Sequence, residues 1–320
     1  MATSTAGAPR SPEAAQRAAG TGPDGPPRPQ DRDQVTWLGH AAAVVAVGGR
    51  RFLVDPLGRG RTRAAGPVDA VLITHSHVDH LNRWSLKVVD RATPLIVPRG
   101  AAPIVADLGF ARVTEVEPGD HVDIGGVDVV AVPTRHDQGR WRKGDAPMCA
   151  GYVVRRGPTA VHHAGDVDFS DHAVFDDIGR QFDLAATLLP IGGMLPVWYY
   201  RRRRTALDRG VHIDPDCALD IFERLGARRL VPVHWGTVNL RLGPPSAPRR
   251  RLEQIAAARA VAGVAVLGHG EALALDPRAL AAGASEHVVA EQVVQHAADA
   301  DQADQHADGR TDDPVAHRQV

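Results

Sequence analysis

The chain of 320 residues contains only two cysteines, Cys149 and Cys217. Two thiols cannot form a disulfide framework or a four-cysteine zinc site, so we expect reduced thiols and a cytoplasmic location. No run of 18 apolar residues occurs, and the sequence therefore offers no membrane-spanning helix.

An excess of charge is also missing. Lys and Arg together number 37, Asp and Glu number 38, and the formal net charge is −1. Proteins held to nucleic acid by general electrostatics usually carry a clear basic excess. A nucleic-acid partner is therefore not expected.

Aromatic residues are scarce: five Trp, three Tyr and six Phe are together fewer than the 16 histidines. Histidine is the commonest metal ligand in proteins. The histidine content is the first pointer to function.

The two ends of the chain differ from its middle. Residues 1–33 combine Pro, Gly, Ala and Ser without apolar periodicity, and residues 281–320 are acidic and polar with four histidines. Neither end can bury enough apolar surface to offset its ordering entropy. We predict a disordered tail over 1–33, one folded domain over 34–280 and a disordered tail over 281–320.

Short apolar segments in the middle are bounded by Gly, Pro or Asp, and Gly48-Gly49 and Gly125-Gly126 are typical of hairpin turns. Helical patterns cover residues 84–90, 103–108, 173–181, 215–225 and 247–261, and a late strand is expected over 264–267. Hairpin-rich β structure with interspersed helices indicates an α+β protein in which two sheets pack together and helices lie outside.

A dense run of ligand-type residues follows the apolar segment Ala70–Ile73: His75, His77, Asp79 and His80. In an extended loop, residues two apart point the same way, so His75 and His77 can grip one ion. Burying such a set without a metal would be costly. The alternative is a solvated histidine-rich loop.

This His-X-His-X-Asp-His run resembles the signature of the metallo-β-lactamase superfamily. The resemblance implies an αββα sandwich with metals at one edge between the sheets. It also implies the ligands His75, His77 and His136 for one ion, Asp79, His80 and His234 for a second, and Asp166 as a bridge.

Imidazole and carboxylate ligands suit two Zn²⁺ ions, although iron and manganese also accept them. A bridging water would lose its proton near neutral pH and attack as hydroxide. The target would be a phosphodiester, lactone, thioester or amide. Asp55 matches an early aspartate of the family and is expected to support the ligand loop without binding metal. His40 is either a similar supporting group or a turn residue.

The segments Trp37-Leu38-Gly39-His40 and His234-Trp235-Gly236-Thr237 resemble the N-acyl-phosphatidylethanolamine phospholipase D-like branch. That resemblance implies a phosphodiesterase of phospholipase D type acting on a small-molecule or phospholipid-like substrate. A lactonase similar to L-ascorbate-6-phosphate lactonase is the alternative, because it shares the first segment. A non-catalytic metal-binding protein is a third hypothesis.

The resemblance also places His212, in His212-Ile213-Asp214-Pro215, near the substrate phosphate. There it would bind a phosphoryl oxygen or protonate a leaving group, and we expect it and Asp79 to act in catalysis. The alternative is a structural histidine before a helix that Asp214 caps.

Trp198 and Tyr199 precede the four arginines of 201–204. They form either a substrate-binding rim, compatible with peripheral membrane contact, or a solvated basic loop.

Overall fold

The computed structural model describes residues 32–136, 148–168, 172–192, 212–238 and 244–275. The expectations for residues 1–31 and 276–320 lie outside this part of the chain. Trp198 and Tyr199 lie outside it as well.

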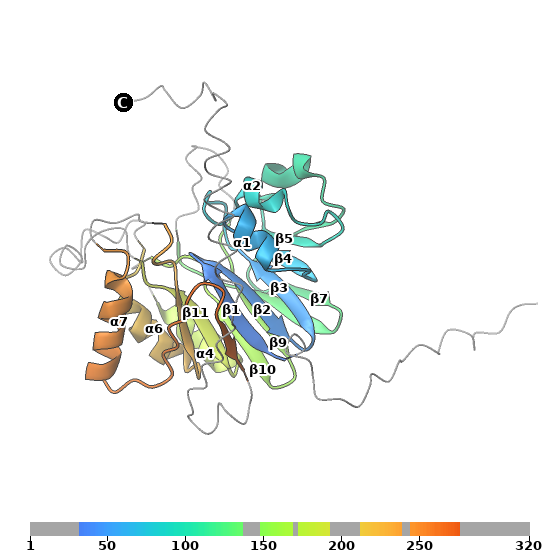
Figure 1. Ribbon diagram of the computed structural model, residues 1–320. Helices are drawn as coiled ribbons and strands as arrows, with labels where there is room; N and C mark the ends of the chain where they lie inside the picture. The colour runs from blue at the N-terminus through green and yellow to red at the C-terminus, as the bar shows by residue number, and fades with distance from the viewer. Residues whose placement is uncertain (1–31, 137–147, 169–171, 193–211, 239–243, 276–320) are drawn as a thin grey trace, which may run out of the picture.

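Two mixed sheets form the centre of the molecule (Figure 1). The first has the order β13 (Ala272–Ala274), β1 (Gln34–Gly39), β2 (Ala42–Val47), β3 (Arg50–Val54), β4 (Ala70–Leu72), β5 (Leu95–Pro98) and β6 (Val113–Val116). The second has the order β12 (Leu230–Val233), β11 (Ala186–Pro190), β10 (Thr159–His163), β9 (Gly151–Arg156), β8 (Val127–Val132) and β7 (His121–Ile124).

Helices cover the outer face of each sheet. The first sheet carries α1 (Arg59–Ala64), α2 (Arg83–Leu86) and α3 (Ala102–Val105), the last followed by a 3₁₀ turn over Ala106–Leu108. The second carries α4 (Ala173–Gln181), α6 (Pro215–Leu225) and α7 (Ala247–Ala258). Figure 1 shows α6 and α7 on one side of the sandwich and α1 and α2 on the other. The expected αββα architecture is confirmed.

Alternation along the strands explains the layers, because successive side chains point to opposite faces. In β8, Val129 and Ala131 enter the core between the sheets, whereas Val130 and Val132 pack under the helices. In β3, Phe52 and Val54 lie between the sheets, and Leu53 packs on the helix side.

The two glycine pairs form the expected hairpin turns. Gly48 and Gly49 have φ of 58° and 75° between β2 and β3, and Gly125 and Gly126 have φ of 60° and 86° between β7 and β8. A positive φ at both central residues is the turn geometry that matches the twist of paired strands.

The prediction of a strand over 264–267 is wrong. Only Val264 forms a bridge there, to Leu230 at the edge of β12. Leu230 N donates to Gly263 O, and Ala265 N donates to Leu230 O. The next donor on that edge of β12 would be residue 232, which is a proline without an N–H group. The pairing therefore stops after one bridge.

Two helices differ in extent from the sequence expectation, and two elements were not expected. Helix α2 covers only Arg83–Leu86 and begins at Asn82, whose side chain accepts a hydrogen bond from Ser85 N. Helix α7 ends at Ala258, three residues early. Helix α1 and strand β13 were not expected at all.

Candidate metal centre

The functional residues meet at one edge of the sandwich because of strand direction. Strands β1, β3 and β4 run the same way in the first sheet, as do β8, β10 and β12 in the second. The carboxyl ends of parallel strands share one edge, where binding residues commonly gather. Each of these strands is followed directly or within a few residues by a site residue: His40, Asp55, the loop 75–80, His136, Asp166 and His234.

A first cluster contains His75, His77, His136 and Asp166, each offering one ligand atom within 4.8 Å of the others. His77 Nδ1 lies 3.0 Å from His75 Nε2 and 3.2 Å from His136 Nε2. Asp166 Oδ2 lies 3.7 Å from the Nε2 atoms of both His75 and His136. All four atoms can therefore face one ion.

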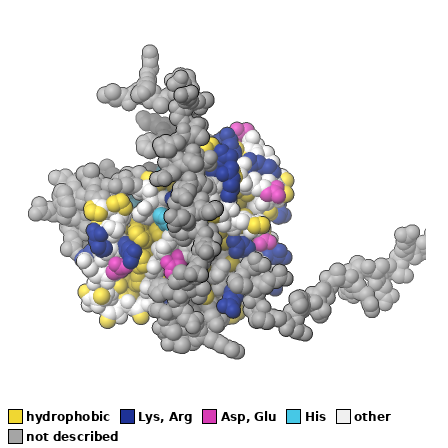
Figure 2. All heavy atoms as spheres, in the orientation of Figure 1, with side chains coloured by type: hydrophobic (Ala, Val, Ile, Leu, Met, Phe, Trp, Pro, Cys, Tyr) yellow, Lys and Arg dark blue, Asp and Glu magenta, His cyan; other side chains and the backbone are white. Residues whose placement is uncertain are grey.

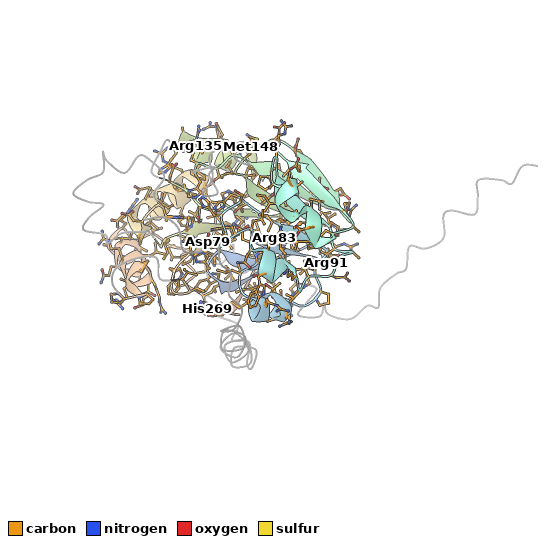
Figure 3. All side chains as sticks on the ribbon, turned by 90° about the horizontal axis from the view of Figure 1, so that it is seen from above. Asp79, Arg83, Arg91, Arg135, Met148 and His269 are labelled. Atoms are coloured by element: carbon orange, nitrogen blue, oxygen red, sulfur yellow. The ribbon has the colours of Figure 1, made fainter. Side chains whose placement is uncertain are left out.

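A second cluster lies beside the first and contains His40, Asp79, His80 and His234. Asp79 Oδ2 is 3.7 Å from His234 Nε2 and 3.9 Å from His80 Nε2. The rings of His80 and His234 are stacked, with centroids 5.5 Å apart. Figure 3 looks down on this edge and labels Asp79 near the middle of the view.

Asp166 joins the two clusters. Its Oδ2 lies 3.1 Å from His80 Nε2, and its Oδ1 lies 3.3 Å from His234 Nε2. Asp166 is therefore within reach of His80 and His234 of the second cluster while it belongs to the first. The structure thus brings together all seven residues that the resemblance implied as ligands, and the second cluster contains His40 in addition.

Buried negative charge at this junction calls for a cation. Asp55 and Asp166 are 0% and 1% exposed. Burial would raise the pKa of Asp166, but His234 and His80 outweigh it and hold the pKa well below its usual range. Burial would likewise lower the pKa of His234, but Asp166 and Asp79 raise it to about 9. Without metal, protonated histidines offset the negative charge of the buried carboxylates. Bound metal ions can offset the same charge in their place.

The buried polar atoms at the junction fit a metal in their chemistry. Both carboxylate oxygens of Asp166, His80 Nε2 and His234 Nε2 are buried, and none makes a well-directed hydrogen bond to the described residues. Leaving such atoms without a partner is costly. Neutral imidazole and carboxylate are ligands that Zn²⁺ accepts in tetrahedral sites.

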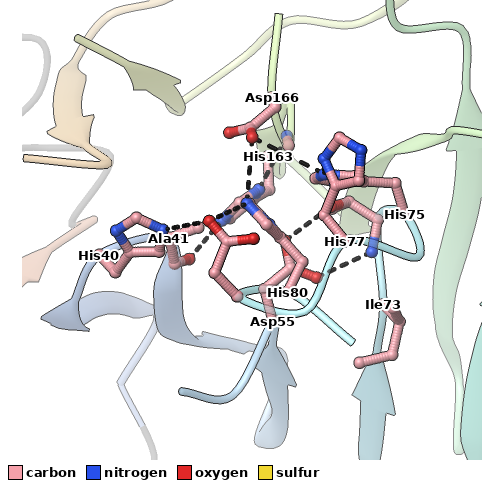
Figure 4. A network of polar contacts seen from close by, with 12 residues as sticks. His40, Ala41, Asp55, Ile73, His75, His77, His80, His163 and Asp166 are labelled. Atoms are coloured by element: carbon pink, nitrogen blue, oxygen red, sulfur yellow. Dashed lines mark hydrogen bonds and ion pairs between the residues drawn. The ribbon is translucent and has the colours of Figure 1, made fainter. Parts of the chain in front are cut away.

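Asp55 supports the ligand loop from below (Figure 4). Its Oδ1 accepts from Thr74 N at 2.8 Å, and its Oδ2 accepts from Thr74 Oγ1 at 2.6 Å and faces His80 Nδ1 at 2.7 Å. A carboxylate on the far nitrogen of a metal-binding histidine fixes its tautomer and orientation. Thr74 Oγ1 also lies 3.0 Å from His75 Nδ1, so the same carboxylate reaches a histidine of each cluster.

His163 holds the turn that carries Asp166. Its Nε2 donates to Ala41 O at 2.9 Å, and its Nδ1 accepts from Gly165 N at 3.1 Å. Gly165 has φ of 66°, and a Cβ there would lie 2.7 Å from Thr74 Cβ. His162 points away from the site and contacts Thr187 Oγ1 at 2.9 Å.

Backbone strain is concentrated at this edge. His40, Asp55 and His234 are three of the four non-glycine residues with positive φ among the residues described, at 53°, 44° and 61°. Such conformations cost about 1–3 kcal/mol each and commonly cluster at functional sites.

His212 lies at the junction and comes from the segment before α6. Its Nδ1 is 3.2 Å from Asp166 Oδ2, and its ring centroid is 5.1 Å from that of His136 and 4.7 Å from that of His234. Burial is the largest effect on its pKa, which falls to about 3. Asp214 caps α6 as expected and accepts from Cys217 N at 2.9 Å.

Comparison with known families decides the membership. Residues 47–235, more than half of the chain, match the family model described as a beta-lactamase superfamily domain. This chain belongs to the beta-lactamase superfamily. The matched range begins in β2 and ends directly after His234, so it contains all seven expected ligands, whereas His40 of the second cluster precedes it.

Curated relatives in this superfamily include proteins with and without a functional name. An uncharacterised protein of Mycobacterium tuberculosis is 31% identical over 68% of this chain, and the chain spans 62% of that protein's length. A UPF0173 metal-dependent hydrolase of Pyrobaculum aerophilum is 30% identical over 71% of this chain and 94% of its own length. An N-acyl-phosphatidylethanolamine-hydrolyzing phospholipase D of Caenorhabditis elegans is 28% identical over 63% of both chains.

Solved structures of other proteins share the fold. The metallo hydrolase Igni18 of Ignicoccus hospitalis has a TM-score of 0.58 at 23% identity and covers 75% of this chain and 97% of its own. The diiron β-hydroxylase CmlA of Streptomyces venezuelae has a TM-score of 0.60 at 21% identity and covers 76% of this chain and 54% of its own. These similarities concern the architecture alone.

Sequence reasoning did not assign roles to Thr74, Gly192 and Thr237. Thr74 links Asp55 to His75, and Thr237 Oγ1 accepts from His40 N at 2.8 Å. A Cβ on Gly192 would lie 2.0 Å from His234 O. Thr74 directly precedes His75, and Thr237 ends the segment His234-Trp235-Gly236-Thr237; these positions were the available signal. Among the described helices, none is long and apolar enough to cross a membrane.

Proposed function

We propose that this superfamily member is a zinc-dependent hydrolase that binds two ions and cleaves phosphodiesters in the manner of a phospholipase D. The observation that carries the proposal is the junction itself: Asp166 reaches both clusters, and His212 lies against the same carboxylate. When bound, two ions there would supply an activated water and stabilise the charge that develops on the substrate.

The residues of the chain divide the work. His75, His77 and His136 would hold one ion, Asp79, His80 and His234 would hold the other, and Asp166 lies within reach of both groups. His212 is buried beside them and donates a hydrogen bond to a phosphoryl oxygen. Water attacks phosphorus, the bond from phosphorus to the alcohol oxygen breaks, and the alcohol leaves with a proton. The similarity to the Caenorhabditis elegans phospholipase D supports this choice of bond.

A parallel assay tests the proposal on the zinc-loaded full chain. The substrates are a bis-aryl phosphodiester, a glycerophospholipid and a lactone, and the variants are His77→Ala and His212→Ala. We expect phosphodiester turnover that His77→Ala abolishes. His212→Ala should lower kcat/KM about 10²–10⁴-fold, the usual contribution of a positioned acid or hydrogen-bonding group, without loss of metal.

A preference for the lactone that persists in His212→Ala would favour the lactonase alternative and refute the phosphodiesterase. Bound metal without turnover of any of the three substrates would favour the non-catalytic hypothesis.

A further inference from the structure

His40 lies beside the second cluster but is not one of the seven expected ligands. It follows β1, has φ of 53° and is 0% exposed. Its backbone is held from three directions: its N donates to Thr237 Oγ1 at 2.8 Å, and its O accepts from His234 N at 2.7 Å and from Trp37 Nε1 at 2.9 Å. The position of the ring is therefore fixed by the fold.

The ring of His40 faces Asp79. Its Nε2 lies 2.9 Å from Asp79 Oδ2, while its Nδ1 is buried and has no hydrogen-bond partner in the described part of the chain. A carboxylate can only accept, and a proton on Nδ1 would be buried without an acceptor. The proton of the neutral ring therefore sits on Nε2 and is donated to Asp79.

His40 also contacts the other two histidines of the second cluster, His80 and His234. Its ring centroid is 3.9 Å from that of His234 and 5.7 Å from that of His80, and its carbonyl holds the backbone of His234. His40 thus lies beside all three residues expected to bind the second ion alone, Asp79, His80 and His234. Its Nε2 is directed at the Asp79 carboxylate, and we therefore assign His40 as a support of the ligand Asp79 rather than as a further ligand.

We propose that His40 is the positioning residue of the second metal site. By donating from Nε2 it fixes the Asp79 carboxylate, and through its carbonyl it fixes the turn of His234, so that both present their ligand atoms to the same ion. The proposal rests on the proposed function, in which two ions bind. Removal of such a supporting group typically costs 10–100-fold in metal affinity.

Two amide substitutions separate this role from simple packing. In His40→Gln the longer side chain can place its NH₂ group near the position of Nε2 and keep the donation to Asp79. In His40→Asn the shorter side chain places its amide near Nδ1 and does not reach Asp79, although Asn tolerates a positive φ well. The control is His121→Asn, which changes a histidine 55% exposed in its side chain and paired with Asp128.

The measurement is metal binding by the full chain, titrated with Zn²⁺ against a competing chelator and with Co²⁺ by its absorption spectrum. We expect two ions for the parent, for His40→Gln and for His121→Asn. His40→Asn should bind the first ion normally, which also shows that it is folded, and the second about 10–100-fold more weakly. In a His77→Ala background the same change should weaken the single remaining ion and alter its Co²⁺ spectrum.

Normal binding of both ions by His40→Asn would overturn the positioning role. Equal loss in His40→Gln and His40→Asn would also overturn it, because the donated hydrogen bond would then not matter. A parent chain that binds fewer than two ions would instead overturn the proposed dinuclear function on which the inference rests.

Discussion

Thr74 and Asp55 form the support beneath the ligand loop. The Asp55 carboxylate accepts from Thr74 N and Thr74 Oγ1 and faces His80 Nδ1, and Thr74 Oγ1 in turn lies against His75 Nδ1. Because Thr74 Oγ1 donates its single proton to Asp55, it accepts from His75 Nδ1–H. This leaves His75 Nε2 without a proton and directed at the first cluster.

Replacing Thr74 by valine keeps the shape of the side chain but removes this relay. We expect Thr74→Val to weaken the first ion about 10–100-fold, since His75 loses the group that fixes its tautomer. Chelator competition would measure the change. The matched control is Thr62→Val, because Thr62 is also buried but its hydroxyl donates to Gly58 O in α1. Equal metal affinities of the two variants would contradict the relay.

His162 gives a pH dependence that is separate from the metal ligands. Burial lowers the pKa of His162 from 6.5 to about 3. Between pH 6.5 and pH 3, His162 is therefore protonated in the unfolded chain and neutral in the folded chain. Stability from this residue is therefore full above pH 6.5 and is lost as the pH falls toward 3.

Chemical unfolding at pH 6.5 and pH 5.5, with equal metal loading, tests this residue. His162→Asn keeps an amide near Thr187 and removes the titrating ring. The parent should lose about 1 kcal/mol more than the variant over this interval, at 1.36 kcal/mol per pH unit. Identical losses would show that His162 is not held neutral.

For single residues, the sequence predicted the candidate metal ligands better than the residues that hold those ligands in place. The run from His75 to His80 was visible because ligand-type residues at short spacing are unusual, and Asp55 was visible because it matches an early aspartate of the resembled family. Thr74 and Thr237 are ordinary residue types, and their partners are distant in sequence: Thr237 lies 197 residues from His40. Such pairs become apparent only once the two sheets are assembled.

Among the elements, the residue after β11 determines how closely the end of the neighbouring strand β12 can approach. Gly192 follows β11, and a Cβ there would overlap His234 O at 2.0 Å and approach His234 Nδ1 at 3.2 Å. Only glycine leaves room for the carbonyl oxygen of His234. This oxygen is part of the backbone and cannot rotate away as the end of a flexible side chain could.

Gly192→Ala should therefore displace His234 and weaken the second ion while the first ion stays bound. Gly268→Ala serves as the control, because its φ is not positive and its Cβ would meet Glu271 Oε2 at an ordinary 3.4 Å. Zinc content after dialysis would reveal the difference. Two tightly bound ions in Gly192→Ala would contradict the close packing of the two strand ends.

Elements with strong local signals were predicted, and weak ones were not. Glycine pairs marked both hairpins, and Asp214 with Pro215 marked the start of α6. Strand β13 has the sequence Ala-Leu-Ala and exists only by pairing with β1, and α1 is rich in arginine without an apolar period. The failed strand at 264–267 depended on Pro232 of another element, which no local pattern contains.

At the scale of the whole molecule, the two sheets act as rigid supports that bring strand ends together at one edge. In the face drawn in Figure 2, histidine occupies one small area, in keeping with the burial of most of the described histidines. The candidate metal centre is thus part of the sandwich itself. Metal binding should therefore be coupled to the stability of the fold.

Metal removal should accordingly lower the stability of the whole chain. At a free Zn²⁺ concentration 100 times its Kd, each site should add about 2.7 kcal/mol to the free energy of unfolding. His77→Ala and His234→Ala should each reduce the zinc-dependent rise in Tm, whereas His121→Ala should leave it unchanged. An equal rise in all variants would place the stabilising ions elsewhere.

We propose that seven residues from both sheets hold two ions and that Asp166 is shared between them. This arrangement can be tested by anomalous X-ray scattering from crystals of the zinc-loaded chain, recorded on both sides of the zinc absorption edge. We expect one peak among His75, His77 and His136, a second among Asp79, His80 and His234, and Asp166 in contact with both. A single peak, or peaks away from these residues, would contradict it.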